Sequence, residues 1–129
     1  MNINLEYEIG KGKVAEFIAD TDVTYNMLQE QLKLFREGVQ DEYPGMQWFN
    51  EKRTVKFLRT WDIIKSDSIT AAQRNLICAY EACGHNLDAL LEFFNGKGKN
   101  IKNKASLNVL LSNARKAIET KYNELYGDN

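Results

Sequence analysis

Apolar residues recur at helical spacing over most of the chain. From Asp22 to Val39 an apolar residue occurs every three or four positions. Thr21 or Asp22 can cap this segment, and a carboxylate is favoured at the positive end of a helix dipole. Residues 105–126 have the longest such stripe, and Ser106 is a candidate cap. Both segments are therefore predicted to be helices that bury one face. The stripe of the second consists of Leu107, Leu110, Leu111, Ala114, Ile118, Tyr122 and Leu125.

The middle of the chain predicts three further helices. Residues 46–64 follow a Pro-Gly turn signal and place aromatic rings on one helical face, with four basic residues between the rings. In residues 68–84, Thr70 and Gln73 have the spacing of a capping box, in which each side chain satisfies a backbone donor of the other. Residues 87–95 are a short apolar segment between an asparagine cap and a glycine stop.

The first 22 residues fit two periods, since Val14, Phe17 and Ile18 recur at helical spacing whereas the residues before them alternate. Residues 2–9 alternate apolar and polar side chains, which predicts a half-buried strand, and the glycines within residues 10–13 predict a break after it. No partner strand is evident, and a lone strand cannot satisfy its backbone. We expect a mainly α-helical, single-domain bundle of about five helices with a possible short N-terminal β-strand. It comprises an acidic and aromatic half, residues 1–64, and a three-helix half, residues 65–129.

The composition is that of an ordinary soluble globule. The chain has 129 residues, of which 43% are apolar and 27% charged, enough for one packed core. No apolar run approaches the roughly 20 residues that span a bilayer, and the N-terminus lacks the features of a signal peptide. Cys78 and Cys83 are too far apart on one predicted helix to be bridged. We therefore expect free thiols, a cytoplasmic location and no membrane partner.

Charge is distributed unevenly along a chain whose net charge is −1. Residues 1–51 contain four basic and ten acidic residues, whereas residues 95–121 contain seven basic residues and one acid. The two regions therefore have net charges of −6 and +6. Either they pack together and neutralise each other, or the basic region is free to bind a polyanion.

The last three predicted helices have the order of a helix-turn-helix module, in which a short helix precedes a longer, basic one. Polar and basic side chains on the last helix can read base edges, and lysines of the preceding loop can contact phosphates. Duplex nucleic acid is the partner that this order predicts. The candidate nucleic-acid-binding residues are Lys97, Lys99, Lys102, Lys104, Asn108, Ser112, Asn113, Arg115 and Lys116.

Two segments of this half, GHNLDALLEFFNG at 84–96 and VLLSNARKAI at 109–118, resemble known DNA-binding proteins. They look like the tail of sigma-factor region 4 and related phage regulators, and they also resemble the N-terminal helix-turn-helix of small terminase subunits. In those families the last helix binds DNA. The resemblance covers less than half of the chain. It implies a small phage or bacterial DNA-binding protein, of regulatory or packaging type, in the bacterial cytoplasm.

The aromatic segment supports an alternative function. Trp48 and Phe49, with Arg53 and Arg59 nearby, are of the residue types that dominate protein interfaces. With the acidic first half they would suit a protein-binding adaptor or an inhibitor whose acidic face mimics DNA. Aromatic rings at helical spacing also commonly form a core. A homo-oligomer is compatible with either function.

No catalytic or metal-binding motif stands out. His85 follows Cys83 at a spacing that metal ligands use, but a structural zinc site needs four nitrogen or sulfur ligands and the chain has three such residues. Neither the nucleophile elbow G-x-S-x-G nor the phosphate loop G-x-x-x-x-G-K-[ST] occurs. We therefore expect no enzyme, no cofactor and no metal, and favour nucleic-acid binding.

Overall fold

The structure, a computed structural model, describes residues 2–38, 49–96 and 98–127, and for residues 2–11 it describes the backbone alone. These ranges contain five α-helices and no strand. The prediction of a mainly α-helical fold is therefore confirmed. The helices are α1 (Asn2–Arg36), α2 (Glu51–Lys65), α3 (Ala71–Ala82), α4 (Leu87–Gly96) and α5 (Lys104–Tyr126).

The predicted N-terminal strand is wrong, because α1 is continuous over 35 residues. The break expected at residues 10–13 is also absent, and the helix expected from residue 22 is the second half of α1. The pattern misleads because Ile3, Tyr7 and Val14 fit a helical stripe as well as residues 2–9 fit a strand. The helix satisfies its backbone groups internally, whereas a lone strand could not.

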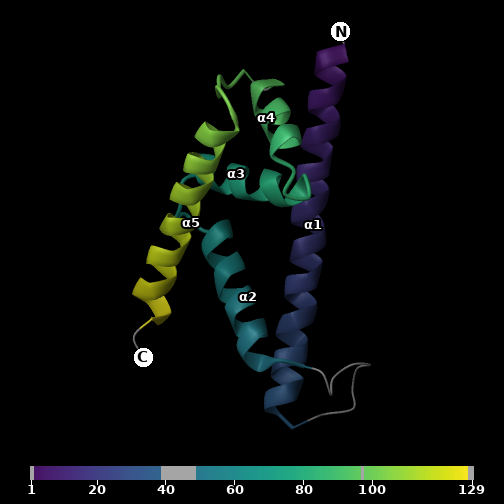
Figure 1. The fold of residues 1–129 in the computed structure, drawn as a ribbon. Helices are drawn as coiled ribbons and strands as arrows, with labels where there is room; N and C mark the ends of the chain where they lie inside the picture. Colours follow the sequence, from purple (N-terminus) through teal and green to yellow (C-terminus); the bar gives the residue numbers. More distant parts are fainter. Residues whose placement is uncertain (1, 39–48, 97, 128–129) are drawn as a thin grey trace.

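The five helices are arranged with α1 and α5 at opposite edges of the molecule (Figure 1). α2 lies between them, and α3 runs crosswise above α2 in this view. Both edge helices pack against α2, α3 and α4. Helices of each sequence half therefore pack against helices of the other half as well as against their own.

Two clusters of buried side chains hold these helices together. The first joins α3, α4 and α5 around Leu90, Leu107 and Leu111, which are fully enclosed. The second surrounds Trp61 of α2 and contains Cys78 of α3. Val14 of α1 packs against both clusters. Each large apolar side chain buried in this way contributes about 1.5–3 kcal/mol.

Side-chain caps define the starts of the later helices. The predicted capping box is confirmed, since Thr70 and Gln73 each accept a hydrogen bond from the other's backbone N–H. Asn86 caps α4 through its side-chain oxygen. The predicted cap of α5 is wrong, because Asn103 is the cap and Ser106 donates its backbone N–H to it. The helix begins at Lys104, which places Asn103 at the cap position and Ser106 inside the first turn, where its backbone N–H needs an acceptor.

Two glycine substitutions test the continuity of α1 and the turn after α3. Gly12→Ala should stabilise the protein by about 0.5–1 kcal/mol, because Gly12 is inside a helix and an added Cβ meets no atom within 4 Å. Gly84→Ala should destabilise it, because Gly84 has a φ of +64° in the turn after α3. Urea unfolding followed by circular dichroism measures both changes. A loss of stability in Gly12→Ala would contradict a helix through residues 10–13.

Candidate functional site

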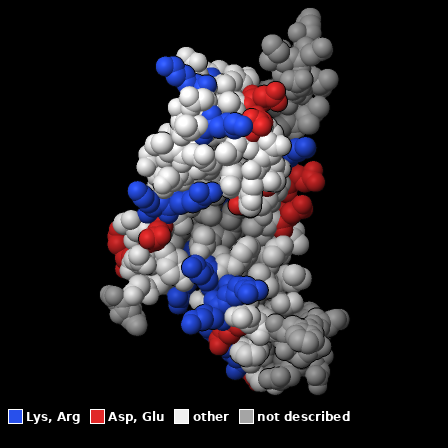
Figure 2. Space-filling view, viewed as in Figure 1, with Lys and Arg blue, Asp and Glu red and all other residues white. Residues whose placement is uncertain are grey.

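A cleft of about 790 Å³ opens between α1, α2, α3 and α5. We call it the central cleft. Its walls carry aromatic rings from all four helices, and charged side chains lie among them. Figure 2 shows this face of the molecule hollowed between groups of Lys and Arg side chains. The rings are Phe17, Phe57, Trp61, Tyr80 and Tyr122, and the charged residues are Lys56, Arg115, Glu81 and Glu119.

Tyrosine rings hold three basic side chains in and beside the central cleft. A cation over an aromatic face is attracted by the ring while its N–H donors remain available to a ligand. The charges are therefore positioned before any ligand arrives. The pairs are Arg115 over Tyr80 at 5.2 Å from charge centre to ring centre, Lys56 over Tyr122 at 5.9 Å, and Arg59 over Tyr126 at 4.2 Å.

A second hollow, of about 750 Å³, continues the central cleft, since Lys56 and Tyr122 line both. It adds Lys52 and Arg59 of α2 to the cationic lining. It also contains Arg36 and Glu51, which form an ion pair at 2.8 Å.

We call the central cleft and the second hollow together the joined cleft. Some of its charged side chains form ion pairs and others do not. Oε2 of Glu81 lies 3.0 Å from Nε2 of His85. In contrast, no carboxylate within the described ranges forms an ion pair with any of the four cations of α2 and α5 that line the joined cleft. Those cations are Lys52, Lys56, Arg59 and Arg115.

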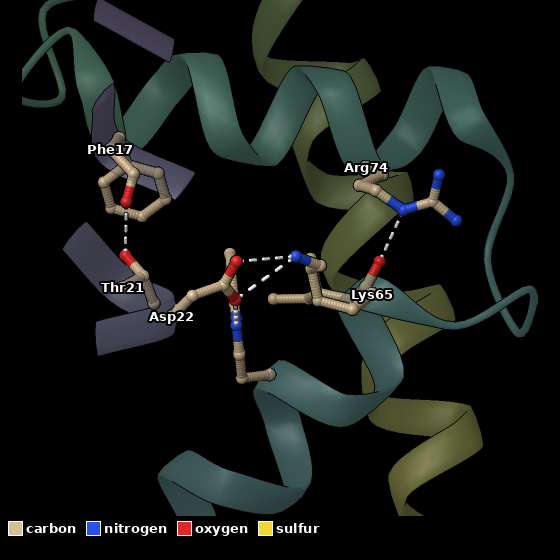
Figure 3. A network of polar contacts seen from close by, with 7 residues as sticks. Phe17, Thr21, Asp22, Lys65 and Arg74 are labelled. Atoms are coloured by element: carbon tan, nitrogen blue, oxygen red, sulfur yellow. Dashed lines mark hydrogen bonds and ion pairs between the residues drawn. The ribbon is translucent and has the colours of Figure 1, made fainter. Parts of the chain in front are cut away.

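A polar network fixes α1 and α2 behind the central cleft (Figure 3). The indole N–H of Trp61 donates to Oδ1 of Asp22 at 2.8 Å, and Nζ of Lys65 lies 3.0 Å from Oδ2. The Trp61 hydrogen bond and then the Lys65 contact lower the pKa of Asp22 from its ordinary 3.8. The carboxylate of Asp22 therefore joins two positions of α2 to α1.

Arg74 extends this network to α3 (Figure 3). Its guanidinium donates to the carbonyl oxygen of Ile64 at 2.6 Å and to that of Ser66 at 2.7 Å. These carbonyls lie at the C-terminal end of α2, where helical partners are lacking. These two hydrogen bonds fix the angle between α2 and α3. They thereby fix the position of Tyr80 in the central cleft.

The loop lysines predicted from sequence lie before and at the start of α5. Lys97 is outside the described residues. Lys99 and Lys102 are exposed and form no ion pair with the described part of the chain, whereas Nζ of Lys104 lies 3.3 Å from Asp88. Asn95 holds this connector, because its side chain makes two hydrogen bonds to the backbone of Ile101, at 3.0 and 3.3 Å.

The five residues predicted on α5 are all exposed, but they do not form one face. Asn108, Ser112 and Arg115 share one side of the helix, because 3.6 residues complete a turn, and Lys116 flanks them. Asn113 points to another side, where it lines a separate hollow with Lys99. Of these five residues, Arg115 alone lines the central cleft.

The residues of the alternative interface are dispersed. Trp48 lies outside the described residues. Phe49 is half-buried and packs against Phe35 of α1, with ring centres 4.9 Å apart. Arg53 is exposed, and Arg59 lies over Tyr126. Phe49 therefore contributes to packing between α1 and the start of α2.

Sequence reasoning missed the contribution of α2 to the site. Lys52, Lys56 and Arg59 recur at spacings of four and three, which places them on one side of a helix. This spacing could have identified them as a basic face. Tyr80 and Tyr122 gave no such signal, since each belongs to an apolar stripe and its partner cation comes from another helix.

Burial affects both cysteine thiols. Burial raises the pKa of the Cys78 thiol to about 11, and burial also raises that of Cys83. Both thiols are therefore protonated at neutral pH, a form that is a poor nucleophile and metal ligand. Across the described ranges, no three His, Cys, Asp or Glu side chains gather as a metal site would require.

Comparisons of the chain with protein-family models, curated protein sequences and solved structures returned no significant match. None of the helices in the described ranges combines the length and the apolar character needed to cross a membrane. The function is therefore inferred from the cleft and its charges.

Replacing Asp22 tests the network behind the cleft. A pKa lowered by folding means that Asp22 stabilises the protein above about pH 4 and that this contribution is lost as the pH falls through its folded value. Asp22→Asn, which does not titrate there, should be less stable at pH 7 and lose less stability on acidification. Urea unfolding at several pH values measures this. Asp67→Asn, at an exposed acid in the α2–α3 connection, is the control. If the free energy of unfolding of wild type and of Asp22→Asn fell equally as the pH was lowered, the network would be contradicted.

Proposed function

We propose that the chain binds nucleic acid through the central cleft and the basic side chains around it. The observation that carries this proposal is the set of three cations held over tyrosine rings, where Lys56, Arg59 and Arg115 converge from α2 and α5. Lys and Arg neutralise phosphates and release their counterions, which supplies most sequence-independent affinity for nucleic acid.

The aromatic lining supports a role in contacting bases as well as phosphates. Proteins that bind single strands combine a basic groove with rings on which unpaired bases stack. Phe57 and Tyr122 are half-buried, so part of each ring is accessible from the cleft. A single strand or an unpaired base therefore suits the central cleft better than an intact duplex, which favours contacts to its outer phosphates.

The distribution of charge over the surface agrees with this function. Figure 2 shows Lys and Arg side chains at several heights along the face formed by α5 and α2. Lys99, Lys102 and Lys116 would extend the path of a polyanion beyond the cleft. These lysines of the loop and of α5, which were candidates from the sequence, thus support binding, and the basic residues of α2 add to them.

Two matched triple variants test the proposal. The cleft variant combines Lys52→Gln, Lys56→Gln and Arg115→Gln, and the loop variant combines Lys99→Gln, Lys102→Gln and Lys104→Gln. Each removes three positive charges. The cleft variant should bind a labelled single strand at least about tenfold more weakly and lower the salt slope by about two to three units, and the loop variant should have a smaller effect. Fluorescence anisotropy over a salt series, with a duplex of the same sequence in parallel, measures both.

Each outcome decides a different part of the proposal. Undetectable binding by the wild type would remove nucleic-acid binding as the function, and equal binding by all three proteins would exclude both the cleft and the loop as its site. A loss confined to the loop variant would exclude the cleft and favour the helix-turn-helix arrangement predicted from sequence. Stronger binding of the duplex would contradict base stacking in the cleft. Circular dichroism confirms that both variants remain folded.

A further inference from the structure

The outer side of α1 carries an apolar pair surrounded by acids. Val23 is 67% exposed and Met27 is 49% exposed, and the two are four residues apart on the same side of the helix. Glu16, Asp20 and Glu30 lie on this side as well, because 3.6 residues complete a turn. We call these five residues the acidic stripe.

Nothing in the described parts of the molecule covers or neutralises the acidic stripe. Its three carboxylates form no ion pair there. The side of α1 that packs into the protein, with Val14, is opposite. Lys13 and Lys33, the nearest cations along the helix, point about 80° to either side of Val23.

The start of α5 carries a feature of opposite charge. Two adjoining hollows, of about 360 and 490 Å³, share Asn100, Ile101 and Leu110 as lining residues. Val109 and Leu110 are 58% and 44% exposed. The charged residues that line the two hollows are Lys99 and Lys102, with no acid among them. We call this pair of hollows the basic furrow.

The basic furrow is preformed. Asn95 binds both the N–H and the carbonyl of Ile101 through its side chain, which fixes the connector over α4. Ile101 also packs against the buried cluster of α3, α4 and α5. An incoming apolar side chain would therefore meet an ordered wall, and binding would not have to order the loop.

We propose that the acidic stripe of one copy of the chain docks into the basic furrow of a second copy. Both surfaces expose apolar side chains at their centre, and the charges around these are of one sign on each surface and of opposite sign between the two. A molecule cannot join its own two surfaces, because α1 and α5 are opposite edges of the bundle (Figure 1).

The proposed contact joins two different surfaces, so it is heterologous, and repeated use of it forms rings or open chains of molecules. It goes beyond nucleic-acid binding and does not depend on it. The basic furrow and the central cleft share no lining residue. Copies arranged in this way would leave their central clefts free and would cover Lys99 and Lys102.

Two complementary double variants test this contact. The stripe variant combines Val23→Ser and Met27→Ser, and the furrow variant combines Val109→Ser and Leu110→Ser. All four side chains are exposed, so the fold should persist, which circular dichroism checks. Sedimentation velocity should show wild-type protein growing in size with concentration, weaker association at high salt, and each variant monomeric alone. An equimolar mixture should form a heterodimer and nothing larger, because one intact stripe meets one intact furrow.

Several results would overturn the proposal. Wild-type protein that stays monomeric at the highest soluble concentration would exclude self-association. A mixture of the variants that remains monomeric would show that any wild-type association uses other surfaces. Association that persists in either variant alone would do the same. If the furrow variant instead lost binding to the labelled single strand while the stripe variant kept it, the furrow would belong to the nucleic-acid surface.

Discussion

The burial of Trp61 against α1 is the interaction on which the rest of the structure depends. The side chain is 5% exposed, and its ring meets the ring of Phe17 edge-on, with centres 6.1 Å apart. Its N–H reaches the carboxylate of Asp22. A buried donor without a partner costs about 1–3 kcal/mol, so the indole can be buried here because Asp22 stands opposite it. The apolar and polar contacts of one side chain thus specify the same position of α2 along α1.

The central cleft follows from this position. With Trp61 turned toward α1, Lys56 and Arg59 of α2 reach the tyrosines of α5. Arg74 fixes the exit of α3 from α2 and so brings Tyr80 beneath Arg115. The cleft walls are therefore a consequence of how three helices are joined, and a change at the buried end of α2 would displace the basic residues at its exposed side.

The sequence predicted most of what depends on near neighbours. The caps and apolar stripes of α3, α4 and α5 are local signals, and these helices were confirmed, although Asn103 replaced Ser106 as a cap. The start of α1 was not predictable from period alone, since residues 2–9 fit both a strand and a helix. The cleft could not be predicted, because Phe17, Tyr80 and Arg115 are far apart in sequence and meet through interhelical angles that periodicity does not determine.

The charge asymmetry of the sequence leaves two outcomes open, mutual neutralisation or segregation, and the structure distinguishes them for the described residues. Mutual neutralisation would pair the lysines before and at the start of α5 with acids of residues 1–51. Instead, Lys104 forms an ion pair with Asp88 of α4, and Lys99 and Lys102 form no ion pair with the described residues. Glu16, Asp20 and Glu30 of α1 lie on the opposite edge, where they form no ion pair with the described residues. Because the unlike charges are separated, they do not neutralise each other within one molecule. The electrostatic potential of each surface can therefore act on another molecule. A chain with a net charge of −1 can therefore present both a surface for polyanions and a surface for cationic partners.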